Sequence, residues 1–462
     1  MKRNIINRIL SVVVLLFVVA AVDAQTLRTG YFLKGNPYRY RINPALVNDQ
    51  NYISLPLYGN IGLNTAGNVG LANFVYDSPN GVDLVTFMHP SVSADEFLGK
   101  LEGDNRIMAD MDITIMSAGF FAFGGYNTID LSLRSRNGMN IPYDMFKFMK
   151  VMGSNDYSFG DLNMRTRNFF DLSFGHSRKI TNDLTVGARL KVLVGMAYAD
   201  VMMDNMDISM SGDRWLINAR GTASVAMGGN FTLNEDGAVD GYENVSVGAT
   251  GKGFGIDLGA VYDLSNVVTK GLVVSASLND IGYINWNNVA KAGISPDAPY
   301  EFDGFEELAM NDDTPGRNLE DQFDNMKEDL EDFFSFEDKG EGSVKESLGA
   351  TLNLGVEYTM PFYEKMSAGV LYTNRFDDMY PYSQLSLMVN VAPFKNFNFA
   401  VSGTTSTYGA GFGAMANLHA SGFNFFIGTD CFVSKVGKQC IPLENMNASV
   451  SFGVNIPFGA KR

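Results

Sequence analysis

Long runs in which apolar residues alternate with polar or small ones constrain this chain more than any other feature of its sequence. One run covers residues 184–198 and another covers residues 348–360, with lengths of 15 and 13 residues. Strands of soluble sheets average about 5–6 residues, whereas a tilted strand that crosses a membrane needs about 9–11 residues. The two runs therefore predict membrane-crossing β-strands. A soluble β-sandwich with long strands is the alternative.

The C-terminal strand shows the same pattern most clearly. Every second residue from Val450 to Phe458 is apolar, and Ser451, Gly453 and Asn455 lie between the first four of them. An amphipathic strand that ends in an aromatic residue is typical of bacterial outer-membrane barrels. Residues 459–462 follow it as a short tail.

The number and spacing of the candidate strands predict a single barrel over residues 51–458. Sixteen candidates are present, and 14 is equally acceptable because the pair near 201–225 is the weakest. Tight turns at 361–364 and 393–395 alternate with longer links at 375–381 and 433–445. Short periplasmic turns and longer outer loops alternate in this class. The fold class predicted is all-β, an antiparallel transmembrane β-barrel of 14–16 strands.

The N-terminus predicts export from the cytoplasm. Lys2, Arg3 and Arg8 precede an apolar stretch over residues 9–22, and Ala24 ends a small-x-small-like site. This is the pattern of a secretory signal peptide, here residues 1–24. An uncleaved inner-membrane anchor is the alternative, although the apolar stretch is short for a membrane span.

An acidic segment interrupts the strand pattern. Residues 301–341 hold 16 acidic residues against Arg317, Lys327 and Lys339. Apolar residues from Leu319 to Phe333 recur at steps of three and four, which predicts a helix in an outer loop. A solvated cap, a divalent-cation site and a docking surface for a partner all remain open for it.

The remaining composition excludes several classes of function. A net charge of −16 argues against a nucleic-acid partner. The three histidines are scattered, and the motifs of common hydrolases and nucleotide-binding enzymes are missing. We therefore expect no enzyme, no cofactor and no metal site. Cys431 and Cys440 bracket the last outer loop, and we expect them to form a structural disulfide.

The strand phase places charged residues of both signs on the face expected to line the lumen. They either pair across the lumen or line a path for a solute. The predicted set is Asp130, Arg134, Asp171, Arg189, Lys191, Asp257 and Glu357.

The segment before the first strand, residues 25–50, is expected to be a periplasmic segment or a plug. Four basic residues alternate there with three tyrosines, and the stretch INPAL follows at 42–46. With YISLP at 52–56, LNDIGYINW at 278–286 and the NIPFGAKR terminus, it resembles an uncharacterised Bacteroidota outer-membrane β-barrel family, a domain of unknown function. The pattern is also similar to fatty-acid-transporter-like barrels and barrels associated with type IX secretion. The resemblance implies about 14 strands and no known activity or substrate.

Two functions fit these features. The first is passive transport or uptake of small solutes, hydrophobic ones included, across the outer membrane of a Gram-negative bacterium. The second is a non-enzymatic structural or adaptor barrel of an envelope or secretion complex. The partners expected are outer-membrane lipid, a small hydrophobic solute and an envelope protein. A soluble exported β-protein is a third alternative.

Overall fold

The structure, a computed structural model, describes most of the chain beyond the N-terminus. The described residues are 27–79, 84–151, 156–210, 214–234, 237–246, 248–294, 299–302, 336–420, 422–431 and 447–459. The predicted signal peptide and the predicted acidic helix lie outside these ranges. No helix within them is long and apolar enough to cross a membrane.

Twenty-three strands dominate the described residues, and 19 of them belong to one sheet. In chain order they are β1 (Asn51–Ser54), β2 (Ile61–Gly67), β3 (Val75–Asp77), β4 (Leu84–Thr86), β5 (Asp104–Ala122), β6 (Gly125–Pro142), β7 (Asp156–Phe159), β8 (Leu162–Lys179), β9 (Leu184–Met210), β10 (Trp215–Ala226), β11 (Asn230–Leu233), β12 (Val239–Glu243), β13 (Gly251–Asp263), β14 (Leu272–Ile294), β15 (Tyr300–Phe302), β16 (Glu337–Ser347), β17 (Ala350–Thr359), β18 (Met366–Phe376), β19 (Tyr382–Phe394), β20 (Phe397–Ser406), β21 (Gly409–Ala420), β22 (Phe423–Thr429) and β23 (Ala448–Phe458).

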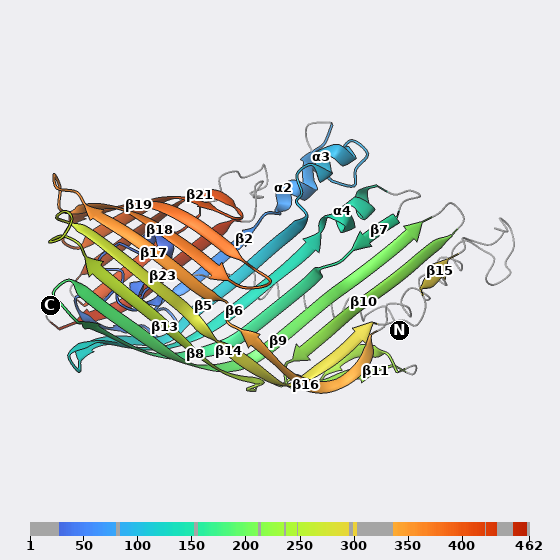
Figure 1. Ribbon diagram of the computed structural model, residues 1–462, viewed down its shortest axis with the longest axis horizontal. Helices are drawn as coiled ribbons and strands as arrows, with labels where there is room; N and C mark the ends of the chain where they lie inside the picture. The colour runs from blue at the N-terminus through green and yellow to red at the C-terminus, as the bar shows by residue number, and fades with distance from the viewer. Residues whose placement is uncertain are drawn as a thin grey trace.

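The large sheet closes on itself as an antiparallel barrel (Figure 1). The last strand, β23, pairs with both β1 and β2, which together fill the first position of the wall. Strands β10 and β13 also share one position, because each pairs with a different half of β9 and of β14. Counted in this way, the barrel has 14 strand positions.

Two of the strand boundaries expected from the sequence pattern are wrong. The sequence pattern suggested separate strands at 183–199 and 201–211, but β9 runs without interruption from Leu184 to Met210. The pattern also gave no strand at 61–67, where β2 completes the position that β1 begins. A bulge in β9 leaves Met196 unpaired, because Asn168 and Phe169 of β8 pair with Ala197 and Gly195, and it shifts the alternation there. A strict period of two cannot follow such a shift.

The barrel wall is polar inside and apolar outside. Leu387 and Val401 are 60% and 45% exposed on the outer face, whereas Ser386 and Ser402 are 1% and 5% exposed on the inner face. A soluble barrel would show the opposite arrangement, since apolar side chains avoid water. An apolar outer surface is stable in lipid, and this polarity is that of a transmembrane β-barrel.

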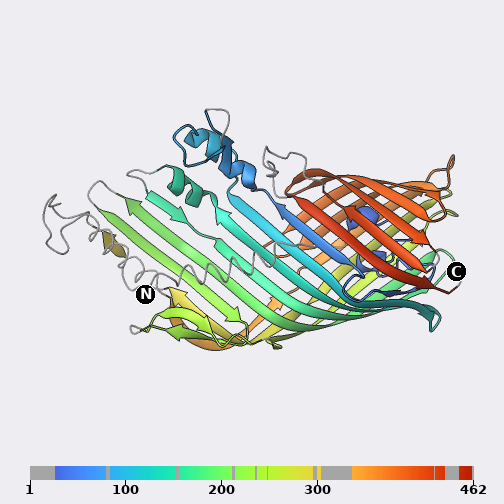
Figure 2. The same ribbon diagram turned by 180° about the vertical axis from the view of Figure 1, so that it is seen from behind.

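The wall is much taller on one side than on the other. Strand β9 has 27 residues, whereas β22 has seven. At about 3.3 Å per residue, β9 is about 90 Å long, and a barrel needs an apolar band of only about 25 Å to cross a membrane. The long strands extend at the end opposite the tight turns, as Figures 1 and 2 show.

Short helices lie at this extended end (Figure 2). They are α2 (Leu71–Phe74), α3 (Ala94–Leu98) and α4 (Tyr143–Lys150). The Ser93 hydroxyl caps α3 by accepting a hydrogen bond from the Glu96 amide at 3.1 Å. Phe74, Phe97 and Phe146 pack together and give these helices a small core of their own.

Candidate functional site

The described part of the N-terminal segment lies inside the barrel and fills its lumen. We call residues 27–47 the plug. It contains two short 3-10 helices, η1 (Arg28–Gly30) and η2 (Arg39–Arg41). Tyr31 and Tyr38 are 0% and 1% exposed. Of the two placements expected for this segment, the described residues occupy the lumen.

Asparagine side chains of the wall hold the backbone of the plug. Carbonyl groups in a plug have no strand partner, so each needs another donor. The carbonyl of Ile42 accepts hydrogen bonds from Ser277 and Asn279, each at 2.6 Å, and from Asn353 at 3.3 Å. The carbonyls of Lys34 and Gly35 are bonded by the amides of Asn398, Asn417 and Asn424.

The INPAL stretch rests on two glycines of the wall. The Asn43 amide group donates to Tyr31 Oη at 3.1 Å and to the carbonyls of Ala260 and Ala276 at 3.3 Å. A Cβ atom at Gly187 would overlap the Pro44 backbone, and one at Gly259 would overlap the Asn43 side chain. Glycine at these two positions therefore lets the plug lie directly against the wall.

Asp130 joins the plug to the wall. Its carboxylate accepts hydrogen bonds from Tyr40 at 2.5 Å and from Ser117 at 2.7 Å. It also pairs with Arg41 of the plug at 3.2 Å and with Arg189 of the wall at 3.3 Å. A buried carboxylate is stable only when such partners replace its water.

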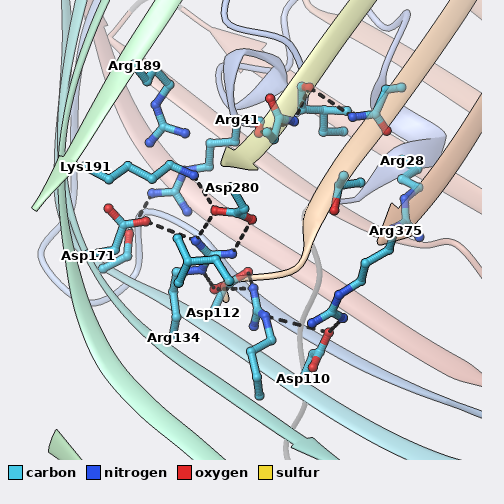
Figure 3. A pocket seen from close by; sticks show the side chains of 17 residues that line it. Arg28, Arg41, Asp110, Asp112, Arg134, Asp171, Arg189, Lys191, Asp280 and Arg375 are labelled. Carbon is cyan, nitrogen blue, oxygen red and sulfur yellow. Dashed lines mark hydrogen bonds and ion pairs between the residues drawn. The ribbon is translucent and has the colours of Figure 1, made fainter. Parts of the chain in front are cut away.

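A chain of ion pairs continues from Asp130 across the lumen, and Figure 3 shows the part that joins Lys191, Asp280 and Arg134. Arg189 pairs with Asp257 at 3.1 Å, and Lys191 bridges Asp257 and Asp280 at 2.7 and 2.6 Å. Asp280 in turn accepts two hydrogen bonds from Arg134 at 2.8 Å. The lumen is thus crossed by alternating charges rather than by an open channel.

The chain of ion pairs then extends towards the taller end of the wall. Arg134 also pairs with Asp171 and Asp112, and it is followed by Arg136, Asp110, Arg375, Asp377, Arg167, Glu346, Arg165 and Asp200, each within 4.0 Å of its neighbour. Buried ion pairs of this kind bring little net stability, but removing one partner is costly.

The loop between β18 and β19 covers the lumen at the end opposite the tight turns. Asp377 there pairs with Arg167 at 3.1 Å, and Tyr380 packs so closely on Gly138 that a Cβ atom would overlap its ring. Burial would raise the pKa of Asp377, but the guanidinium groups of Arg375 and Arg167 outweigh this and hold the pKa below its usual range. The loop is therefore fixed to the opposite wall by charge.

A cavity of about 100 Å³ remains between the plug and the ion pairs. It has room for about three water molecules. Seven basic and four acidic side chains line it, the labelled residues of Figure 3 and Arg136. Arg28 lies at its edge: its guanidinium group donates to Gln384 at 3.0 Å and to Tyr382 at 3.3 Å, and its backbone amide donates to the Asp430 carboxylate at 2.8 Å.

Six of the seven charged residues predicted from the strand phase lie together in this chain of ion pairs. They are Asp130, Arg134, Asp171, Arg189, Lys191 and Asp257. Glu357 does not join them. It shares the inward face of β17 with Asn353, and the described residues give it no ion-pair partner.

Sequence reasoning missed about two thirds of this chain of ion pairs, including Asp280 and the arginines nearer the taller end of the wall. One signal was available for several of them. Charged residues stand two positions apart, and so on one face of a strand, in Asp110/Asp112, Arg134/Arg136, Arg165/Arg167, Arg189/Lys191 and Arg375/Asp377.

The predicted disulfide and the predicted cation site fall largely on residues that the structure does not describe. Cys440 and the acidic clusters of 303–335 lie outside the described residues, so the disulfide and the cation site stay predictions. Within the described ranges, no three histidine, cysteine or carboxylate side chains are grouped so that they could hold a metal ion.

Comparisons with known proteins place the chain in a family. No curated protein matches it. Among solved structures, a Ralstonia pickettii toluene transporter, TbuX, shares 8% identity over 91% of this chain and 94% of its own, with a TM-score of 0.41. A Pseudomonas aeruginosa FadL homologue shares 11% over 95% and 99%, with a TM-score of 0.42. A family model matches residues 44–430, and the chain belongs to the family of unknown function DUF5723.

Proposed function

We propose that this chain is an outer-membrane barrel for passive passage of small solutes, closed in the conformation described here by its own plug. The observation that carries the proposal is a pair of cavities on either side of the plug. Arg41 and Ile42 line the cavity within the lumen, and Lys34 and Arg39 line a larger one at the tight-turn end. Movement of the residues between them would join the two cavities.

The lining of the lumen points to polar solutes. The inner cavity is bounded mainly by arginine, lysine and aspartate side chains. A hydrophobic solute would gain no apolar contact there and would cost the charged groups their hydration. We therefore propose small polar solutes rather than the small hydrophobic solute expected from the sequence.

The outer membrane of a Gram-negative bacterium is the proposed location. The predicted signal peptide and the apolar outer face of the wall support it. A barrel with an apolar outer face is stable in a lipid bilayer or a detergent micelle rather than in water.

An adaptor role is the second candidate, and one observation favours it. The wall from β5 to β9, with β14, is far taller than a membrane requires. Passage of a solute does not need this extension, whereas a docking partner outside the membrane would use it.

Liposome swelling distinguishes the two candidates. The purified protein is inserted into liposomes, and swelling is followed in isosmotic glycerol, arabinose and a disaccharide. Size-dependent swelling above that of empty liposomes supports passage. Swelling equal to that of empty liposomes, for the protein and for a variant with a loosened plug, contradicts it and favours the adaptor.

A further inference from the structure

The larger cavity, at the tight-turn end of the barrel, has properties that closure of the lumen does not require. Its volume is about 550 Å³, which is within the range of small-molecule sites. Lys34 and Arg39 of the plug and Lys365 and Lys395 of two wall turns converge on it. Asp49 is the one carboxylate among the described residues that line it.

These four cations differ from those of the lumen, because no carboxylate of the described residues lies within 4.0 Å of them, although Glu357 and Asp49 act on Arg39 from farther away. Among the described residues, Arg39 donates to the Val47 carbonyl at 3.3 Å and Lys365 to the Pro393 carbonyl at 3.4 Å, and neither they nor Lys34 and Lys395 form an ion pair. The chain as a whole carries −16, so the lining of this cavity, with four cations and one carboxylate, is a local reversal of charge. A concave site lined by one sign of charge concentrates the field and attracts counter-ions.

Polar atoms inside the cavity also lack hydrogen-bond partners. The side-chain amides of Asn398 and Asn424 donate to the plug, but the Oδ1 atom of each is buried and accepts no hydrogen bond from the described residues. The two residues are 3% and 7% exposed. Arg39 Nε is likewise buried and unpaired. Buried polar groups of native proteins nearly always have a partner, so these atoms point to a ligand that carries both acceptors and donors.

We propose that this cavity binds a small soluble polyanion of the periplasm, one that carries carboxylate or phosphate groups together with hydroxyl groups. The anionic groups would pair with Lys34, Lys395 and Arg39, and the hydroxyl groups would donate to Asn398 and Asn424. Binding does not depend on passage through the lumen, so this proposal stands or falls separately from the proposed function.

Calorimetric titration of the full-length protein in neutral detergent at low ionic strength tests the proposal. Citrate, with three carboxylates and one hydroxyl, is the probe, and tricarballylate is the matched probe without the hydroxyl. We expect citrate to bind, tricarballylate to bind more weakly, and the double variant Lys34→Gln/Lys395→Gln to lose about tenfold or more in affinity, since it removes two of the cations that face the anion.

The control is Lys179→Gln/Lys270→Gln, which removes the same charge from the same end of the barrel but outside the cavity. Citrate binding that survives in the control and falls in the test variant supports the site. No citrate binding to the wild type at millimolar concentration overturns it, and so does an equal loss in both variants. Competition by phosphatidylglycerol in nanodiscs would assign the anion to a lipid headgroup and overturn the soluble ligand.

Discussion

Arg134 and Asp280 face each other across the lumen, with both terminal nitrogens of Arg134 at 2.8 Å from separate oxygens of the Asp280 carboxylate. Asp280 makes this contact from a backbone with φ of 56°, in the middle of β14. L-residues rarely adopt this conformation, which costs about 1–3 kcal/mol. The irregularity turns the carboxylate into the lumen, where Lys191 also contacts it at 2.6 Å.

Neutralising Asp280 should weaken the whole fold. Asp280→Asn keeps the shape of the side chain but leaves Arg134 and Lys191 with less negative charge in a buried place. Loss of one partner of a buried pair costs about 3–5 kcal/mol. Because Arg134 retains its ion pair with Asp171 and Lys191 retains its ion pair with Asp257, we expect the free energy of unfolding to fall by about 3 kcal/mol, the lower end of this range. Urea unfolding in detergent micelles, followed by tryptophan fluorescence, measures it.

The matched control is Glu364→Gln. It breaks an ion pair with Lys270 in which the side chains are 74% and 88% exposed. Such surface pairs contribute little, and we expect no measurable change. Equal unfolding midpoints for Asp280→Asn and the wild type would show that the central ion pair does not hold the lumen together.

Filling the glycine contacts should release the plug without unfolding the barrel. In Gly187→Val the new side chain would occupy the space of Pro44. We expect faster hydrogen exchange in residues 41–46 and an unchanged heat-dependent gel mobility. Gly403→Ala is the control, because a Cβ atom there has only Phe412 within 4 Å, at 3.9 Å. Unchanged exchange in Gly187→Val would contradict the direct contact between plug and wall.

The loop that covers the outer side should be sensitive to acid through Asp377. Its pKa is held below the ordinary value of about 3.9, so its charge stabilises the folded state at neutral pH. This contribution is complete above the unfolded pKa and is lost as the pH falls through the folded pKa. Asp377→Asn should therefore unfold at a lower temperature than the wild type at pH 7, and the difference should shrink below about pH 4. A difference that is constant with pH would exclude this role.

Deletion of residues 303–335 should leave the barrel folded. Strand β15, before the deletion, pairs with β10, and β16, after it, pairs with β14, so both ends belong to the sheet independently of the segment. Heat-dependent gel mobility tests this outcome. Loss of the mobility shift would mean that the acidic segment is needed for folding.

Alternation along the strands was sufficient to predict the barrel, because polarity on the two faces of a membrane-spanning strand repeats every two residues. It could not predict irregular positions. Asp280 and the bulge beside Phe169 change the phase within a strand, and the division of one wall position between β10 and β13 depends on pairing with distant strands. These features follow from tertiary contacts and leave no local period.

The candidate site was accessible only in part for a similar reason. Strand phase gave the inward direction of Arg189 and Lys191, but it gave no partners, since Asp130 and Asp257 come from other strands. The sequence offered a plug as one of two placements for the segment before β1, but it could not decide between them. Asn43 is bonded to residues more than 200 positions away, and no local pattern encodes such a contact.

Single-channel conductance in planar bilayers tests most directly whether the plug closes a path. The wild type and Gly187→Val are compared at equal insertion, with Gly403→Ala as the control. We predict that the wild type and the control stay closed, apart from rare openings, and that Gly187→Val opens often. A steady open current in the wild type would contradict the closed lumen. Silence of Gly187→Val, although hydrogen exchange shows its plug released, would contradict passive passage.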